Sequence, residues 1–202
     1  MKLRGAFAGL IAVVAVAGCS SVVNGHGVAA PRDLHTSTGG GFPSTPPSTS
    51  SSAGRPGAIE SPDNDFSVLL PDGWTDGTDK VSGIALTGYI GPVIDGFAIN
   101  INVLRSPVGN LSLRMFLRAT RSNLHRALQV TSMSPATPRL VDGTAAYEYS
   151  VIDQQAGRAL EQRQTLIIRE GSGYVITYSA PLSNYAFYRA DADAIIDSWQ
   201  WG

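Results

Sequence analysis

Few side chains in this 202-residue sequence could carry out chemistry: one cysteine, three histidines and scattered carboxylates. A serine hydrolase needs a histidine base, and within residues 59–202 only His125 could serve. His125 shares one flank of a predicted helix with Arg114, Arg118 and Arg121, so its neighbours are cations rather than an orienting carboxylate. The nucleophile motif Gly-x-Ser-x-Gly is also absent from the sequence. We therefore predict no hydrolase site and no catalytic residue.

Carboxylates cluster in two short segments, at 63–65 (DND) and 72–79 (DGWTDGTD). Neither has the spacing of a calcium-binding loop, and Trp74 stands where such a loop needs an oxygen ligand. Asp, Asn and Gly also favour tight turns. Asp193 and Asp197 lie one helical turn apart on what we predict to be the outer face of the last helix, whereas catalytic carboxylates would face a cleft. We predict turns, no metal site and no cofactor.

The single cysteine, Cys19, ends a short apolar segment near the N-terminus. Lys2 and Arg4 give a basic start, and the uncharged stretch 5–17 has about 13 residues, short of the roughly 20 that a membrane-spanning helix needs. The segment Val16-Ala17-Gly18-Cys19 resembles a bacterial lipobox, in which the cysteine sulfur receives a diacylglycerol and the signal is cut just before it. We therefore predict that residues 1–18 are removed and that Cys19 anchors the chain in a membrane.

Serine, threonine, glycine and proline dominate the stretch from Thr36 to Ala58. Such a composition buries too little apolar surface to offset the entropy of ordering the chain. We expect residues 19–58 to form a disordered tether with a reach of roughly 35 Å. Together with the lipid, this tether predicts a domain held at the extracytoplasmic face of the plasma membrane.

Residues 59–202 carry all the periodic hydrophobic patterns and are predicted to form one folded domain. A domain of this size buries roughly 68% of its unfolded surface. The net charge of the chain is −1, and no basic segment is dense enough for nucleic-acid binding. The domain has no cysteine, which excludes internal disulfides. We expect a monomer stabilised by one packed core.

Alternating apolar residues predict several strands in this domain, at 66–70, 84–90, 97–104, 147–152, 160–169 and 174–180. The Gly-rich segment between the last two strands predicts a hairpin and hence an antiparallel sheet. Helical spacing of apolar residues predicts two amphipathic helices, at 112–128 with Ser112 as N-cap and at 184–200 with Ser183 as N-cap. The expected fold class is α+β, with two helices packed on an antiparallel sheet.

Several segments together resemble the LpqN/LpqT family of mycobacterial lipoproteins. They are the lipobox, the Ser/Thr/Pro tether, FSVLLPDGW at 66–74, YVITYSAP at 174–181 and a final helix ending in Trp199. The domain of that family is similar to the PsbP-like fold, an antiparallel sheet with packed helices. The resemblance implies a fold and a cell-envelope location, and it brings no catalytic residue.

Two surfaces could bind a partner. Arg114, Arg118, Arg121 and His125 form a basic stripe beside the apolar arc of the first helix, which is either a solvated helix face or a contact for anionic lipid headgroups. The second surface is a predicted polar side of the sheet, which is either a wet face or a groove. Its candidate groove residues are Asn100, Asn102, Glu148, Glu161, Arg163 and Thr177.

These features favour a membrane-anchored envelope lipoprotein that acts as a non-enzymatic binding or accessory module for a protein, a glycan or another envelope component. The alternative is a carrier of a lipid or small amphiphile in a cavity of the domain. An envelope hydrolase is the third class, and it would need catalytic residues that the sequence does not show.

The anchor prediction can be tested with Cys19→Ala. We expect the variant to leave the membrane fraction when cells are fractionated, because the sulfur that carries the lipid is gone. A variant that stays in the membrane fraction as the unaltered protein does would contradict the predicted anchor.

Overall fold

The computed structural model describes residues 55–81 and 85–202, so the predicted signal segment and Cys19 lie outside the described residues. The strands are β1 (Ile59–Glu60), β2 (Phe66–Val68), β3 (Thr75–Asp76), β4 (Thr87–Ile94), β5 (Phe97–Pro107), β6 (Gln129–Met133), β7 (Thr137–Val141), β8 (Thr144–Gln155), β9 (Arg158–Arg169), β10 (Ser172–Pro181) and β11 (Gln200–Trp201). The helices are α1 (Thr78–Val81), α2 (Leu113–Ala127) and α3 (Tyr185–Asp197). None of these helices is long and apolar enough to cross a membrane.

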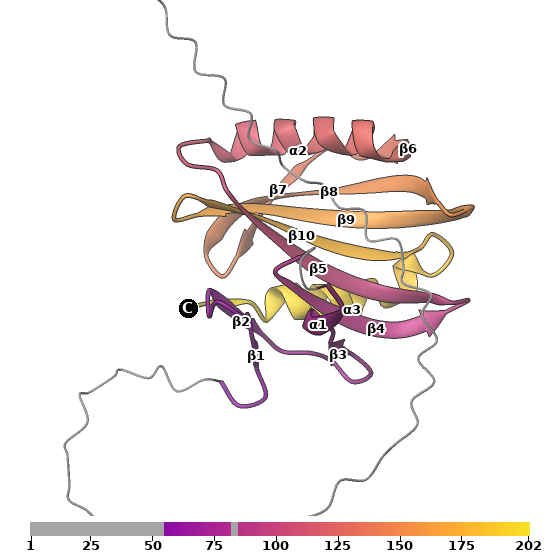
Figure 1. The fold of residues 1–202 in the computed structure, drawn as a ribbon, viewed down its shortest axis with the longest axis horizontal. Coiled ribbons are helices and arrows are strands. Elements are labelled where there is room, and N and C mark those ends of the chain that lie inside the picture. The colour runs from indigo at the N-terminus through magenta and orange to yellow at the C-terminus, as the bar shows by residue number, and fades with distance from the viewer. Residues whose placement is uncertain (1–54, 82–84) are drawn as a thin grey trace, which may run out of the picture.

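An eight-stranded antiparallel sheet forms the centre of the domain (Figure 1). Its strand order is β3-β4-β5-β10-β9-β8-β6, and β7 pairs with β8 beside β6. The predicted hairpin between β9 and β10 is confirmed, and its turn residues Glu170 and Gly171 both have the positive φ that a two-residue turn requires. The α+β fold class is likewise confirmed. The short helix α1 and the strands β1, β3, β6, β7 and β11 were not predicted.

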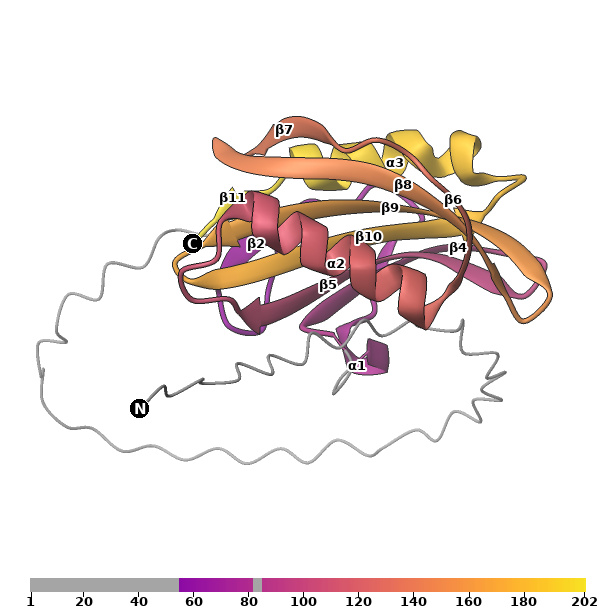
Figure 2. The ribbon, with the colours of Figure 1, turned by 90° about the horizontal axis from the view of Figure 1, so that it is seen from above.

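Helices α2 and α3 pack on opposite faces of this sheet (Figure 2), which we call the α2 face and the α3 face. The predicted alternation in β5 is confirmed, because Ile99, Ile101 and Val103 are buried on the α3 face. Leu104, which follows Val103, packs with Phe116 and Leu124 of α2 on the other face. The period of two along each strand therefore divides the domain into two separate cores, whereas one core was predicted from the sequence.

Helix α2 begins as predicted, with the Ser112 side chain accepting a hydrogen bond from the Met115 backbone N–H at 3.3 Å. The prediction for α3 is wrong at both ends: the helix stops at Asp197 rather than at position 200, and Gln200 belongs to β11. Asn184, not Ser183, is the N-cap of α3, and the Ser183 hydroxyl instead donates to the Asn184 side-chain oxygen at 2.7 Å. The predicted inward face is confirmed by the burial of Tyr185, Ala192 and Ile195 in α3 and of Trp199 just after it, while Tyr188 is half-buried.

A smaller three-stranded sheet, in the order β1-β2-β11, closes the α3 face near the C-terminus. Phe66 of β2 stacks on Trp199 with ring centroids 3.8 Å apart, and it meets the edge of Trp201. Trp74 lies beside α3, since its indole N–H donates to Asp191 at 3.2 Å. Tyr174 of β10 contacts both Phe66 and Trp201, so the aromatic cluster ties the smaller sheet to the large one.

Phe66 is 1% exposed, so Phe66→Ala should lower the free energy of unfolding by about 3–5 kcal/mol. At this size the melting temperature should fall by more than about 10 °C. Phe187→Ala is the matched control, because Phe187 is 78% exposed on α3 and its loss should change the melting temperature little. Equal effects of the two substitutions on thermal melts would contradict this packing.

Candidate functional site

Polar side chains form a continuous row on the α2 face of the central strands. The register aligns Asn102 of β5 with Thr177 of β10, and Thr177 in turn with Gln164 of β9. The neighbouring line of the same face is Asn100, Ser179 and Gln162. We call these six residues the polar row: Asn100, Asn102, Gln162, Gln164, Thr177 and Ser179. Except for the half-buried Asn100, every member is between 3% and 7% exposed.

Hydrogen bonds orient part of the polar row. The Tyr149 hydroxyl donates to the Gln164 side-chain oxygen at 2.7 Å, and the Asn102 amide donates to the Asn100 side-chain oxygen at 3.5 Å. The Gln162 amide donates to the Asp153 carboxylate at 3.3 Å. These contacts hold four side-chain amides in defined orientations.

Asp153 is a fully buried carboxyl at the end of this row. Burial raises the pKa of Asp153, and the hydrogen bonds from Gln155 and Gln162 oppose that shift. Burial also raises the pKa of Tyr149, against the effect of the Arg121 charge, so this hydroxyl stays protonated and remains a donor. The α2 face thus contains ordered polar groups as well as the apolar contact between α2 and the sheet.

The six residues predicted to line one groove do not lie on one face, and this prediction is wrong. Asn100, Asn102 and Thr177 belong to the polar row. Arg163 and Glu161 pair with Tyr178 and Ala180, whose side chains face α3, so both lie on the α3 face. Glu148 pairs with Thr165 on that same face. Strand β9 is polar on both faces over this stretch, so the sequence pattern alone could not assign its residues to either one.

Arg163 is the centre of a charged network between the sheet and α3. Its side chain is 3% exposed, its guanidinium lies 2.5 Å from the Asp193 carboxylate and 3.7 Å from Glu148, and it sits over the Tyr178 ring at 5.7 Å. Arg139 extends the network, pairing with Glu148 at 2.6 Å and with Asp197 of α3 at 2.8 Å.

The two α3 carboxylates lie on the outer side of the helix as predicted, with side chains 37% and 68% exposed, but their partners in the sheet were not predicted. Asp193 and Asp197 do not form a free outer pair, because each binds an arginine of the sheet. Arg163 is 3% exposed and Asp193 is 37% exposed, so the pair is partly buried, and loss of Asp193 would leave the buried guanidinium with the more distant Glu148 alone. The pair therefore helps to hold α3 in place. Burial raises the pKa of Glu161 nearby, while a hydrogen bond with Ser150 and the charge of Arg189 oppose that shift.

The basic stripe of α2 divides into two parts. Arg121 is half-buried, stacks over the Tyr149 ring at 4.9 Å and donates to the Ser134 carbonyl at 2.9 Å, so it belongs to the packing. Arg114, Arg118 and His125 are exposed, and none forms an ion pair with a carboxylate of the described residues. The three exposed side chains remain available to a partner.

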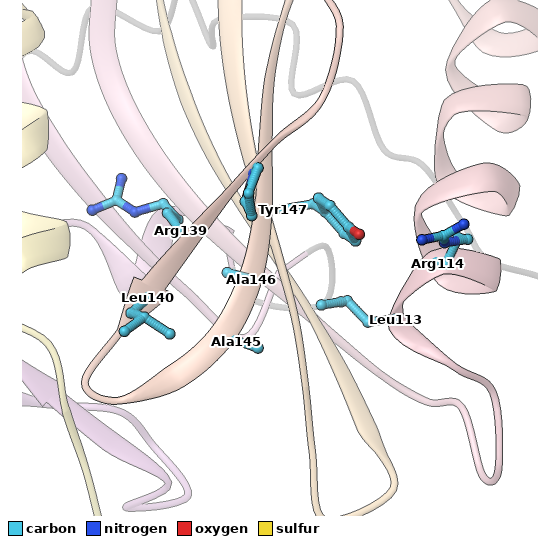
Figure 3. Close-up of a pocket in the computed structure, with 8 residues that line it drawn as sticks. Leu113, Arg114, Arg139, Leu140, Ala145, Ala146 and Tyr147 are labelled. Carbon is cyan, nitrogen blue, oxygen red and sulfur yellow. The ribbon is translucent and has the colours of Figure 1, made fainter.

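A groove of 430 Å³ separates the first turn of α2 from the β7–β8 hairpin (Figure 3). Its walls are mostly apolar, and the hydroxyl end of Tyr147 points toward Arg114 across it. Arg139 points away from α2, into the network described above. The lining residues are Leu113, Arg114, Pro138, Arg139, Leu140, Ala145, Ala146 and Tyr147. Within residues 55–81 and 85–202, no three His, Cys, Asp or Glu residues lie close enough to hold a metal ion.

No protein-family model and no curated protein matches this sequence. Solved structures do share its fold. The crystal structure of LpqN from Mycobacterium tuberculosis, described as involved in cell envelope biogenesis, matches with a TM-score of 0.55 and 15% identity, over 71% of this chain and 88% of that chain. The solution structure of cyanobacterial PsbP from Synechocystis matches with a TM-score of 0.50 and 12% identity, over 72% and 91% of the two chains. The predicted resemblance is thus confirmed for the fold.

Asp153→Asn should remove a pH-dependent decrease in the free energy of unfolding that comes from the buried Asp153 carboxylate. The folded pKa is raised above the unfolded value of about 3.9, so the protonated carboxyl favours the folded state below that pH. This contribution is lost as the pH rises through the folded pKa. Thermal melts should therefore show the variant gaining stability relative to the unaltered protein between pH 4 and 8, by about 1.4 kcal/mol for each unit of raised pKa. A difference that does not change with pH would contradict this account of Asp153.

Proposed function

We propose that this chain is a membrane-anchored lipoprotein of the cell envelope whose domain binds an envelope component without catalysing a reaction. The lipobox around Cys19 supports the anchor. The fold shared with LpqN, which is itself described as involved in cell envelope biogenesis, supports the location. The domain is the part of the chain that would meet the partner.

The difference between the two faces of the sheet carries this proposal. The α3 face is closed by α3, β2 and β11 over an apolar and aromatic core. The α2 face has the polar row, which is mostly buried, and separately an apolar groove lined by Arg114 and Tyr147 together with exposed arginines of α2. Small-molecule and partner sites typically join apolar walls to a few oriented polar groups. The α2 face therefore supports binding better than any other described surface.

A carrier of a lipid or small amphiphile is the second candidate. The groove of 430 Å³ supports it, because this volume lies within the range of about 300–1,000 Å³ typical of ligand sites. An envelope hydrolase is the third candidate, and its general base would be His125 on the exposed side of α2. Turnover of an ester, amide or glycan substrate that His125→Ala abolishes would overturn the non-enzymatic proposal.

A matched pair of threonine substitutions tests the binding face. Thr177 lies in the polar row, whereas Thr165 lies on the α3 face of the adjacent strand, and both are at most 5% exposed. Thr→Val keeps the shape and removes one hydroxyl. We expect native mass spectrometry of the full chain from its own host to show a bound component whose occupancy falls about 2–10-fold in Thr177→Val, as loss of one hydrogen bond predicts.

Thr165→Val should leave that occupancy unchanged. Equal loss in both variants would assign the effect to general destabilisation and would contradict binding on the α2 face. The mass of the bound component decides between the two candidates, because a carrier would hold a lipid or small amphiphile and an accessory module would hold a protein or glycan.

A further inference from the structure

We propose that the end of the domain nearest the tether rests on an anionic lipid bilayer through exposed apolar and basic side chains at the start of α2 and on β7. This inference rests on the proposed lipid anchor and adds the orientation of the domain. We call the surface the membrane patch: Leu111, Met115 and Leu140, with Arg114 and Arg118.

The apolar part of the patch is unusually exposed. Leu111, Met115 and Leu140 are 36%, 56% and 66% exposed. Leu111 and Met115 flank the N-cap of α2, and Leu140 lies across the groove from Arg114 (Figure 3). Exposed large apolar residues that gather on a polar surface mark contact sites. Side chains of this length can enter the boundary between headgroups and acyl chains while the fold stays intact.

Charge identifies an anionic bilayer as the partner of this surface. Arg114 and Arg118 stand on α2 beside the apolar residues, and neither forms an ion pair among the described residues. Unpaired arginines next to apolar side chains match a surface that is negative at its headgroups and apolar just beneath them. An apolar pocket on a neutral protein would leave both arginines without a counter-charge.

The described chain begins at the same end of the domain as the membrane patch. Arg55, the first described residue, donates to the Ser198 carbonyl at 2.7 Å. Trp201, three residues after Ser198, donates its backbone N–H to Asp142 at 2.9 Å. Asp142 lies in the turn that follows Leu140. The start of α2, the β7–β8 hairpin and the C-terminus all lie at one end of the sheet (Figure 2). The chain that leads from the proposed anchor at Cys19 therefore enters the domain at the end that carries the membrane patch.

The opposite end of the sheet offers a matched comparison. Leu182 and Phe187, at the start of α3, are 42% and 78% exposed, so apolar exposure alone does not distinguish the two ends. The nearby cations are engaged, since Arg158 donates to the Asp95 carbonyl at 2.5 Å and Arg189 pairs with Asp193 at 3.5 Å. Among the described residues, the tether end therefore places exposed arginines that have no carboxylate partner next to exposed apolar side chains and near the start of the described chain.

Site-specific fluorescence on the lipidated full chain tests the proposal. Cys19 is the only cysteine, and its acylated sulfur would be a thioether that does not react with thiol reagents. Met115→Cys, Leu140→Cys and the control Phe187→Cys can each carry an environment-sensitive dye. The three proteins are reconstituted into vesicles of phosphatidylcholine alone or of phosphatidylcholine with phosphatidylglycerol.

We expect the dyes at positions 115 and 140 to shift to the blue in vesicles that contain phosphatidylglycerol, and the dye at 187 to keep its emission in water. Arg114→Glu with Arg118→Glu should abolish the shift without altering the circular dichroism spectrum, because both side chains are exposed. Raising the salt should weaken the shift, since the Debye length falls from about 30 Å at 0.01 M to about 8 Å at 0.15 M.

Two failures are distinguishable. A protein that does not float with the vesicles, and whose Cys19 takes the dye, would lack the lipid and would overturn the proposed anchor. A protein that floats while the dyes at 115 and 140 behave like the dye at 187 would overturn the membrane patch alone. Equal shifts in both kinds of vesicle would also overturn it, because the arginines would then have no role.

Discussion

The register between β8, β9 and β10 is the constraint on which the rest of this structure depends. Successive side chains on a strand point to opposite faces, so a slip of one residue in β9 would exchange Arg163 with a glutamine neighbour. The buried guanidinium would then leave Asp193 and enter the polar row, and an uncharged amide would replace it beneath α3. The short turns of the two hairpins prevent this slip, because each of them permits only one pairing of its strands.

Fixing the register divides the sheet into two faces with different roles. On the α3 face, aromatic rings from β2, α3 and β11 stack around Phe66, and the Arg163 network joins the helix to the sheet. The buried charges are costly to desolvate, and they are tolerated because both carboxylate partners and the Tyr178 ring surround the guanidinium. This face is closed and structural.

The α2 face is the more adaptable of the two. Helix α2 contributes one apolar arc around Phe116 and Leu124, and the sheet next to it carries neutral amides and hydroxyls. Neutral polar groups keep their hydrogen-bonding capacity over a wide pH range, and they are less costly to desolvate than charges when a partner arrives. The groove beside the first turn of α2 then joins this face to the end of the domain at which the described chain begins.

The sequence by itself determined the local features of this protein. Each of them depends on neighbours in the chain: the Ser112 cap on the residue three positions later, the alternation in β5 on a period of two, and the β9–β10 hairpin on a Gly-rich turn. The lipobox prediction at Cys19 has the same local character and lies outside the described residues.

The tertiary structure decided which polar residues share a face, because β9 is polar on both sides and only its pairing with β10 separates Arg163 from Gln164. It also decided that Asp193 and Asp197 bind arginines of the sheet, since residues 30 or more positions apart in sequence meet only when α3 packs. Local sequence patterns specify elements, whereas long-range contacts place their side chains together.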